Sequence, residues 1–446
     1  MFQTFGKRMA LIIVGALTFV VLNGNAYAIP SYARQTGLAC SSCHYSFPEL
    51  TPFGRNFKLN GYTMVGRQTI DAKAKGDQGA LKFLRNFLMS AMVQASYNNV
   101  AKPVPGTKTG NMEFPQQLSL FLGGEITPHI GAFTQITYDD QGASFGWDNT
   151  DIRYSNQGLI GDNPITYGLT LNNNPTVEDL WNSTPAWGYP YASSSSAPTP
   201  GASTLIDGAF GGNVAGLGAF AMYDNLIYAN LTGYKSAPQG GSFPPDANAN
   251  FTISGVTPYW RVALQKQFSD TYVEIGTYGL SANIYPSGIS GATDNYTDVA
   301  FDFQVEHALG KNEMIFHSTW IHENQDLKAT YAAGGSANST NSLSTFRIDG
   351  SYMFCDGLDV MAQYFNTYGS ADGGLYSPAS VTGSLTGSPN SSGVIAEFDF
   401  SPWQNTRLGL QYVMYTKFNG GSTNYDGSGR DAANNNTLYV STWIVL

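Results

Sequence analysis

The run Cys40-Ser-Ser-Cys43-His44 places two thiols and an imidazole within five residues. C-x-x-C-H is the signature of covalent haem c attachment, in which both thiols bond to the porphyrin and the histidine takes one axial position on the iron. The chemistry of such a centre is one-electron transfer. We therefore expect one haem c, held by Cys40 and Cys43, with His44 as an iron ligand.

A C-x-x-C run has two other common uses in proteins. A redox dithiol needs no histidine after it and usually follows a strand in a βαβ unit. A zinc site needs two further ligands, whereas the chain has only one more cysteine, Cys355. Both uses fit the motif less well than haem attachment.

The second axial position has several candidates. A methionine opposite the histidine is a common cytochrome c arrangement, and Met64 is the first choice for it. Met89, Met92, Met112 and His129 are rivals, the last if the haem lies inside a larger structure. A water molecule or an open position is the remaining alternative.

Residues 29–84 form the expected haem module and a linker. Apolar side chains that could cover the porphyrin are Phe47, Leu50, Phe53, Phe57 and Leu59, and cations that could meet its propionates are Arg34, Arg55 and Lys58. Ordinary packing and solvated charge are the alternative roles for these residues. A module this small cannot bury a large core alone, so it needs the haem or the rest of the chain around it.

Residues 1–28 resemble a secretory leader. Lys7 and Arg8 precede an apolar run over 10–22, and 26–28 read Ala-Tyr-Ala, a small-residue cleavage site. The run of 13 residues is shorter than the roughly 20 that a spanning helix needs. Loss of two cations and no anion changes the formal charge from −10 to −12, which argues against a nucleic-acid partner.

The composition after the leader is unusual for a soluble enzyme. Charged residues make up 12 % of the chain, about half the typical share of roughly 25 %. The sequence holds 50 Gly, 27 Tyr and 26 Phe. No stretch of the expected mature chain reaches 18 consecutive apolar residues, so helical spans are not expected. These features favour a β protein whose outer face meets lipid.

Residues 85–446 contain about sixteen segments in which apolar and polar residues alternate. Phe301 and Phe303, for example, alternate with Asp298, Asp302 and Glu306. Such alternation predicts strands with one apolar and one polar face, and segments of about ten residues suffice to cross a bilayer at a tilt. The three segments near 148–157, 164–172 and 215–222 are the least regular.

The connections between these segments are alternately tight and long. Ser269-Asp270 is a tight turn, whereas 369–390 and 417–433 are long and rich in Gly and Ser. Short turns at one end and long loops at the other are typical of outer-membrane barrels. We therefore predict an all-β, transmembrane antiparallel barrel of about 16 strands, with the haem module plugging its lumen. The loop 173–214 either folds into the lumen or lies disordered on the surface.

The chain resembles the fused cytochrome–porin family of outer-membrane iron oxidases. The resemblance is strongest over 30–64, in 33–37 (Ala-Arg-Gln-Thr-Gly), the haem motif at 40–44, Pro48, 53–55 (Phe-Gly-Arg), 57–58 (Phe-Lys) and 61–62 (Gly-Tyr). Over the rest of the chain it is one of architecture only. It implies haem thioethers at Cys40 and Cys43, and an outer-membrane location in a Gram-negative bacterium.

By this resemblance, the protein oxidises extracellular Fe(II) and passes the electron to a periplasmic c-type cytochrome or copper protein. Lumenal carboxylates would favour a cation near the pore, with ordinary solvated lining as the alternative: Asp298, Asp302, Glu306, Asp349, Glu397 and Asp399. Three other functions stay open. They are electron transfer with another extracellular donor or acceptor, solute transport through a porin with a haem-bearing plug, and a haem enzyme acting on an organic substrate.

Overall fold

The computed structural model describes residues 31–64, 89–139, 144–183, 187–208, 210–211, 213–237, 252–355 and 357–446. The expected leader at 1–28 and most of the linker that precedes residue 85 lie outside these ranges. Both therefore stay predictions. Among the described residues, no helix combines the length and the apolar character that a membrane span requires.

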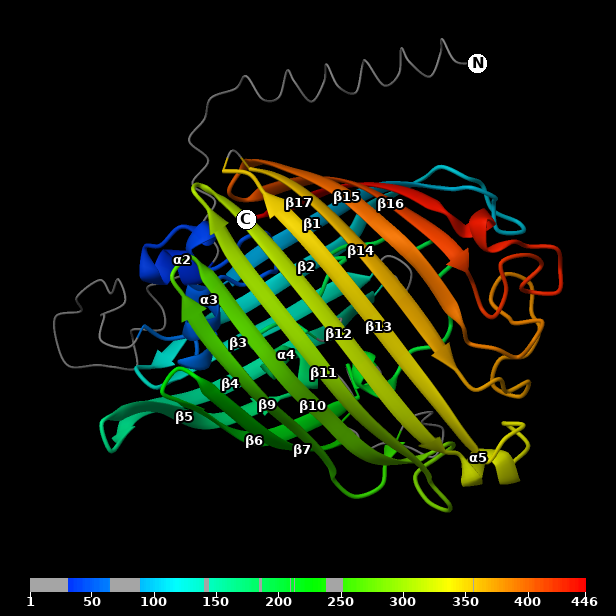
Figure 1. Cartoon of the computed structure of the whole chain (residues 1–446), viewed down its shortest axis with the longest axis horizontal. Helices are drawn as coiled ribbons and strands as arrows, with labels where there is room; N and C mark the ends of the chain where they lie inside the picture. Colours follow the sequence, from blue (N-terminus) through cyan, green and yellow to red (C-terminus); the bar gives the residue numbers. More distant parts are fainter. Residues whose placement is uncertain are drawn as a thin grey trace, which may run out of the picture.

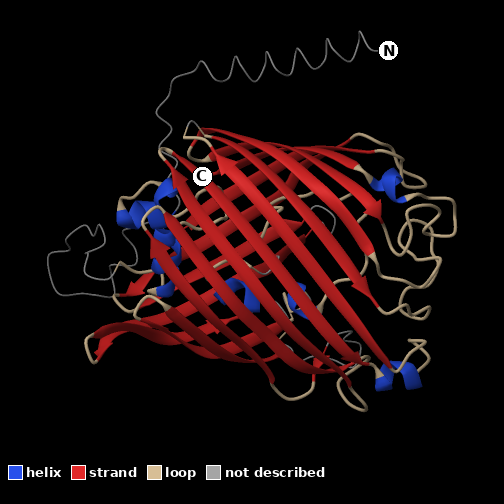
Figure 2. Ribbon diagram, viewed as in Figure 1, coloured by secondary structure: helices blue, strands red, loops and turns tan. Residues whose placement is uncertain are grey.

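Sixteen long antiparallel strands form a single closed sheet around a lumen (Figures 1 and 2). A two-residue strand, β8 (Thr252–Ile253), pairs with one end of β10. The long strands are β1 (Met89–Val100), β2 (Asn111–Thr127), β3 (Ile130–Asp139), β4 (Ser144–Ile160), β5 (Asn163–Asn172), β6 (Val214–Tyr223), β7 (Ile227–Ser236), β9 (Thr257–Phe268), β10 (Thr271–Tyr285), β11 (Asp294–Leu309), β12 (Asn312–Asp326), β13 (Thr340–Met353), β14 (Leu358–Gly369), β15 (Ser391–Trp403), β16 (Thr406–Lys417) and β17 (Thr437–Val445).

The barrel closes between its first and last strands. Met92 of β1 lies opposite Ser119 of β2 on one side and opposite Val445 of β17 on the other. Because β1 is hydrogen-bonded on both sides, the sheet has no free edge there. The expected antiparallel barrel of about 16 strands is confirmed, and so are the three least regular segments, as β4, β5 and β6.

The side chains of the barrel are arranged inside out relative to a soluble protein. On β11 the carboxylates Asp302 and Glu306 are buried, whereas Phe301 and Phe303 are 53 % and 37 % exposed. Leu231 of β7 is exposed in the same way. A sheet that buries its acids and exposes its phenylalanines has a polar interior and an apolar outer wall, as barrels in lipid do.

The two ends of the barrel differ in their connections. Turns such as 310–311, between β11 and β12, lie at one end, and long connections such as 370–390, between β14 and β15, lie at the other. The turn between β2 and β3 is short, and the number of long strands is even. The start of β1 and the end of β17 therefore both lie at the short-turn end. Figure 1 shows the C-terminus at this end, on the left, together with two short helices.

These two helices belong to residues 31–64, called the N-terminal segment below. It contains α2 (Ser31–Thr36), the 3₁₀ turn η1 (Cys40–Ser42) and α3 (Pro52–Leu59). The segment bonds to strands around the barrel: Ser31 N to Ser90 Oγ of β1 (2.6 Å), Tyr32 Oη to Ala132 O of β3 (2.6 Å), Tyr62 Oη to Asp151 of β4 (2.8 Å), Arg55 Nη1 to Glu306 of β11 (2.5 Å) and Arg407 Nη1 of β16 to Phe47 O (2.9 Å). It therefore fills the short-turn end of the lumen.

The described residues of the long connection 173–213, called the inner loop below, fold into the lumen, which is the first of the two courses expected for this loop. It carries α4 (Pro175–Glu178) and η3 (Leu205–Asp207), whose residues are largely buried. Ile206 N donates to Asp298 of β11 at 2.8 Å, and Asp207 pairs with Arg347 of β13 at 2.7 Å. The lumen is thus occupied by two chain segments, one from each end.

Candidate functional site

The C-x-x-C-H motif at 40–44 forms a single tight turn. The backbone N–H groups of Cys43 and His44 both donate to the carbonyl of Cys40, at 3.0 Å. A spacing of three residues on such a turn places both thiols on the same side. Thr51 stabilises the turn, because its N–H donates to the carbonyl of Cys43 at 2.9 Å.

Helix α3 packs directly against this turn. Thr51 caps it by accepting a bond from Gly54 N at 3.1 Å, and Pro52 occupies its first turn, where its missing N–H costs nothing. A Cβ atom on Gly54 would lie 2.2 Å from the carbonyl oxygen of Cys43. Only glycine lets the helix approach the motif this closely.

A cavity of about 540 Å³ opens beside the turn. Cys40, Cys43 and His44 all line it. Aromatic and aliphatic side chains form much of its wall: Tyr32, Phe47, Leu50, Phe53, Phe57 and Tyr62 of the N-terminal segment, and Met92, Phe121, Phe133, Trp187, Trp443 and Val445 of the barrel and inner loop. Four of the five expected porphyrin-covering residues are present, while Leu59 is buried elsewhere in a cluster with Leu180 and Trp181.

The cavity is shared between the N-terminal segment and the barrel wall. Its lining extends to Asp148 and Asn149 of β4 and to Asn174 and Asp207 of the inner loop. Asp148 lies near the end of β4 that adjoins the long connections. The cavity therefore runs from an apolar region at the motif to a polar region on the loop side.

His44 is oriented by a backbone carbonyl. Its Nδ1 lies 3.2 Å from the oxygen of Pro48, which leaves Nε2 as the nitrogen able to bind a metal. Burial lowers the pKa of His44 to about 4. The imidazole is therefore neutral at ordinary pH, which is the form that ligates metals.

The two thiols are poor candidates for a redox dithiol. Burial raises the pKa of Cys43 to about 11 and also raises the pKa of Cys40. Reactive dithiols have lowered thiol pKa values, because the thiolate is the nucleophile. The environment of this pair instead resembles an apolar pocket.

These observations make the site a good fit for haem c. The volume lies within the 300–1,000 Å³ typical of cofactor pockets, the wall is mostly apolar, and the attachment thiols and a correctly oriented imidazole face the same space. Within the described residues, no three His, Cys, Asp or Glu side chains gather into a site for a bare metal ion.

The three expected propionate partners occupy different places. Lys58 lines the cavity, but its ammonium donates to the carbonyl of Asp179, and burial lowers its pKa to about 7. Arg34 bonds to the carbonyl of Met89, and Arg55 pairs with Glu306. Neither arginine is among the residues that line the cavity. All three tie the N-terminal segment to its surroundings.

The candidates for the second axial position are also separated. Met64 is half-buried and does not line the cavity, so its ligation stays a prediction. Met112 is 81 % exposed, Met89 is on the outward-facing row of β1, and His129 lies at the β2–β3 turn near the carbonyl of Ser155. Met92 is the one of the five that lines the cavity.

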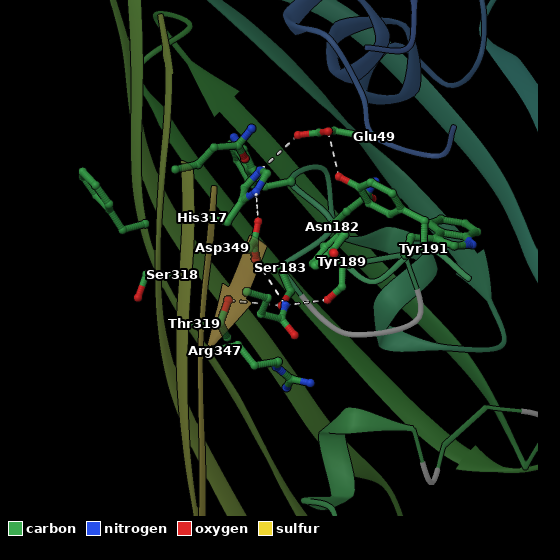
Figure 3. A pocket seen from close by; sticks show the side chains of 16 residues that line it. Glu49, Asn182, Ser183, Tyr189, Tyr191, His317, Ser318, Thr319, Arg347 and Asp349 are labelled. Atoms are coloured by element: carbon green, nitrogen blue, oxygen red, sulfur yellow. Dashed lines mark hydrogen bonds and ion pairs between the residues drawn. The ribbon is translucent and has the colours of Figure 1, made fainter. Parts of the chain in front are cut away.

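A polar network ties the N-terminal segment to β12 and β13 (Figure 3). His317 Nδ1 lies 2.9 Å from Asp349 and its Nε2 lies 3.4 Å from Glu49, which also accepts a bond from Tyr191 at 2.7 Å. These residues border a cavity of about 30 Å³, enough for a water molecule. The carboxylate of Glu49 is thus held by the barrel and the inner loop together.

The expected lumenal carboxylates are mostly paired with arginines. Asp302 bonds to Arg261, and Glu397 and Asp399 both bond to Arg407, at 2.9 and 2.5 Å. Sequence reasoning did not single out these two arginines, although both lie on the polar rows of their strands. These pairs join residues of the barrel wall to one another, whereas Glu306 pairs with Arg55 of the N-terminal segment.

Comparison with known proteins identifies no family. No family model matches the sequence, and no curated protein matches it. Among solved structures, the channel DcaP of Acinetobacter baumannii matches with a TM-score of 0.46 and 10 % identity, covering 80 % of this chain and 96 % of that one. An anion-selective porin from Comamonas acidovorans matches with a TM-score of 0.45 and 9 % identity, covering 80 % of this chain and 98 % of that one. OmpT of Vibrio cholerae matches with a TM-score of 0.43 and 10 % identity, covering 80 % of this chain and 97 % of that one.

Proposed function

We propose that this protein is an outer-membrane electron conduit of a Gram-negative bacterium. It carries one haem c on Cys40 and Cys43, with His44 as an axial ligand, inside the barrel. Its donor is extracellular Fe(II), and its acceptor is a periplasmic c-type cytochrome or copper protein. The observation that carries the proposal is that both thiols and the imidazole line one apolar cavity in the lumen of a barrel with an apolar outer wall.

The residues of the chain have simple roles in this function. The motif turn holds the porphyrin, the Pro48 carbonyl orients His44, and the aromatic wall excludes water. When bound, a haem supplies a site for one electron at a time. Each Fe(II) loses one electron, becomes Fe(III) outside the cell, and reduces one acceptor molecule in the periplasm.

The difference between the two ends of the lumen supports electron transfer from the outside of the cell to the periplasm. Short turns and both chain ends mark the periplasmic side of outer-membrane barrels, and the motif lies there. Asp148 lines the cavity toward the loop side, where a carboxylate attracts a cation. Asp207 also lines it, but its charge is paired with Arg347. Donor and acceptor would then approach from opposite faces of the membrane.

Two measurements test this proposal. The purified protein is expected to keep a haem stain on a denaturing gel, and a C40A/C43A variant is expected to lose it. Anaerobic addition of Fe(II) is expected to reduce the haem within the protein. Absence of covalent haem would overturn the whole proposal. A covalent haem that Fe(II) leaves oxidised, while another donor reduces it, would overturn the choice of donor only.

A second candidate is passive solute transport. The lumen is lined by polar and charged side chains such as Asp302 and Arg261, and polar lumens are typical of channels. Liposomes containing the protein would then swell in small sugars at a rate comparable to those containing a porin. The filled lumen predicts the opposite result, no swelling above protein-free liposomes.

A further inference from the structure

We propose that Met92 supplies the second axial ligand of the haem, an inference that rests on the proposed haem attachment. Met92 is on β1, on the row of residues that faces the lumen. It is 3 % exposed and lines the same cavity as Cys40, Cys43 and His44. A thioether opposite a histidine is an established way to complete the coordination of haem iron.

The other potential ligands in the cavity wall are already engaged. Tyr32 and Tyr62 donate their hydroxyls to Ala132 O and Asp151, at 2.6 and 2.8 Å. Tyr191 and Lys58 likewise donate to Glu49 and to the carbonyl of Asp179. Moving any of them onto iron would break a bond inside the lumen and leave a buried partner unsatisfied. A methionine sulfur is only a weak hydrogen-bond acceptor, so binding iron costs it no comparable contact.

The backbone around Met92 is held firmly. β1 is bonded to β2 and β17, with Ser119 and Val445 directly opposite Met92. His44 belongs to the N-terminal segment, on a separate part of the chain. The two axial ligands would therefore come from two structural parts, and the iron would join the N-terminal segment to the barrel wall.

This arrangement has a consequence that a ligand within the N-terminal segment would not have. Methionine ligation would form only when the segment is seated in the barrel, because Met92 is fixed in the wall. Met64, in contrast, would give the same coordination in a detached segment. The spectrum of the iron thus reports whether the segment is docked.

The test is the visible and NMR spectrum of the full-length protein. The ferric wild type is expected to show the weak red-edge absorption of a sulfur–iron bond and a strongly shifted methionine methyl resonance. M92L, which keeps the volume of the side chain, is expected to lose both while keeping the haem stain. M64L and M89L are the matched controls and are expected to keep both. M92H is expected to restore a six-coordinate low-spin spectrum with a lower midpoint potential.

The outcomes separate the two proposals. Retention of both signals in M92L, or their absence in the wild type, would overturn the role of Met92 while leaving the covalent haem intact. Loss of the signals in M64L but not in M92L would assign the ligand to Met64 instead. Absence of a haem stain in the wild type would overturn the proposed function and this inference with it.

Discussion

At the scale of single residues, the lumen is organised by buried charges. Arg407 of β16 bonds to Glu397 and Asp399, and its Nη1 also donates to the carbonyl of Phe47, 2.9 Å away. The same guanidinium therefore satisfies two wall carboxylates and holds the chain next to the haem motif. Its role is both electrostatic and positional.

Replacing Arg407 by alanine is expected to destabilise the protein strongly. Two buried carboxylates would lose the cation that they share, which typically costs about 3–5 kcal/mol. The free energy of unfolding in detergent, measured by denaturant titration, gives the size of the effect. Lys328→Ala is the matched control, since its pair with Asp326 is exposed and such pairs contribute about 0–1 kcal/mol. Equal effects of the two variants would contradict this account.

At the scale of elements, the haem motif depends on the close approach of α3. Thr51 caps the helix and bonds to the motif turn, and Gly54 faces the carbonyl of Cys43. The helix ends at Leu59, and Gly61, two residues later, has a φ of +69°. A Cβ on Gly61 would lie 2.9 Å from the carbonyl oxygen of Arg153 in β4. One glycine therefore fits the helix to the motif, and the other fits it to the barrel.

Gly54→Ala is expected to disturb the motif. The new Cβ would overlap the Cys43 backbone, which cannot move aside like a flexible side chain, and overpacking of this kind costs about 1–3 kcal/mol. The ratio of covalent haem to protein is expected to fall. Gly201→Ala is the control, because a Cβ there meets nothing within 4 Å. Normal haem content in the Gly54 variant would show that α3 can shift freely.

At the scale of the whole molecule, the barrel has an apolar outer wall and an occupied lumen. The N-terminal segment fills the short-turn end, and the inner loop enters from the other. The apolar outer wall suits contact with lipid. The chain segments inside the lumen determine which solutes can pass through it. These two properties can be tested separately.

Deletion of the N-terminal segment is expected to open the lumen. Its backbone and side chains occupy space that water would fill, so conductance in a planar bilayer should rise well above that of the intact protein. C40A/C43A, which keeps the segment without haem attachment, is expected to stay closed. High conductance of the intact protein would instead support the solute-transport candidate.

If lipid surrounds the outer wall, a charged residue placed on it lowers folding stability by an amount that depends on its depth in the bilayer. Phe301 is in the middle of β11 and 53 % exposed, so Phe301→Arg is expected to reduce the free energy of folding into bilayers by about 2–4 kcal/mol. Val256 is equally exposed but lies between β8 and β9, and Val256→Arg is expected to cost about 0–1 kcal/mol. Similar costs at the two sites would argue against a bilayer around the barrel.

The sequence alone determined the barrel, and it contains the C-x-x-C-H motif from which haem attachment is proposed. Alternation along segments such as β11 is a local property, because successive side chains of a strand point to opposite faces. The motif is equally local, since its two cysteines and its histidine lie within five residues. Both could be read without knowing how the segments pack.

Tertiary structure alone decided what surrounds the motif. Met92 and Asp148 meet Cys43 in one cavity although they are about 50 and 100 positions away in the chain. The course of the inner loop and the pairing of Arg407 also depend on strands far apart in sequence. Such contacts follow from the closure of the barrel, which no local pattern specifies, so the choice among the methionines required the folded chain.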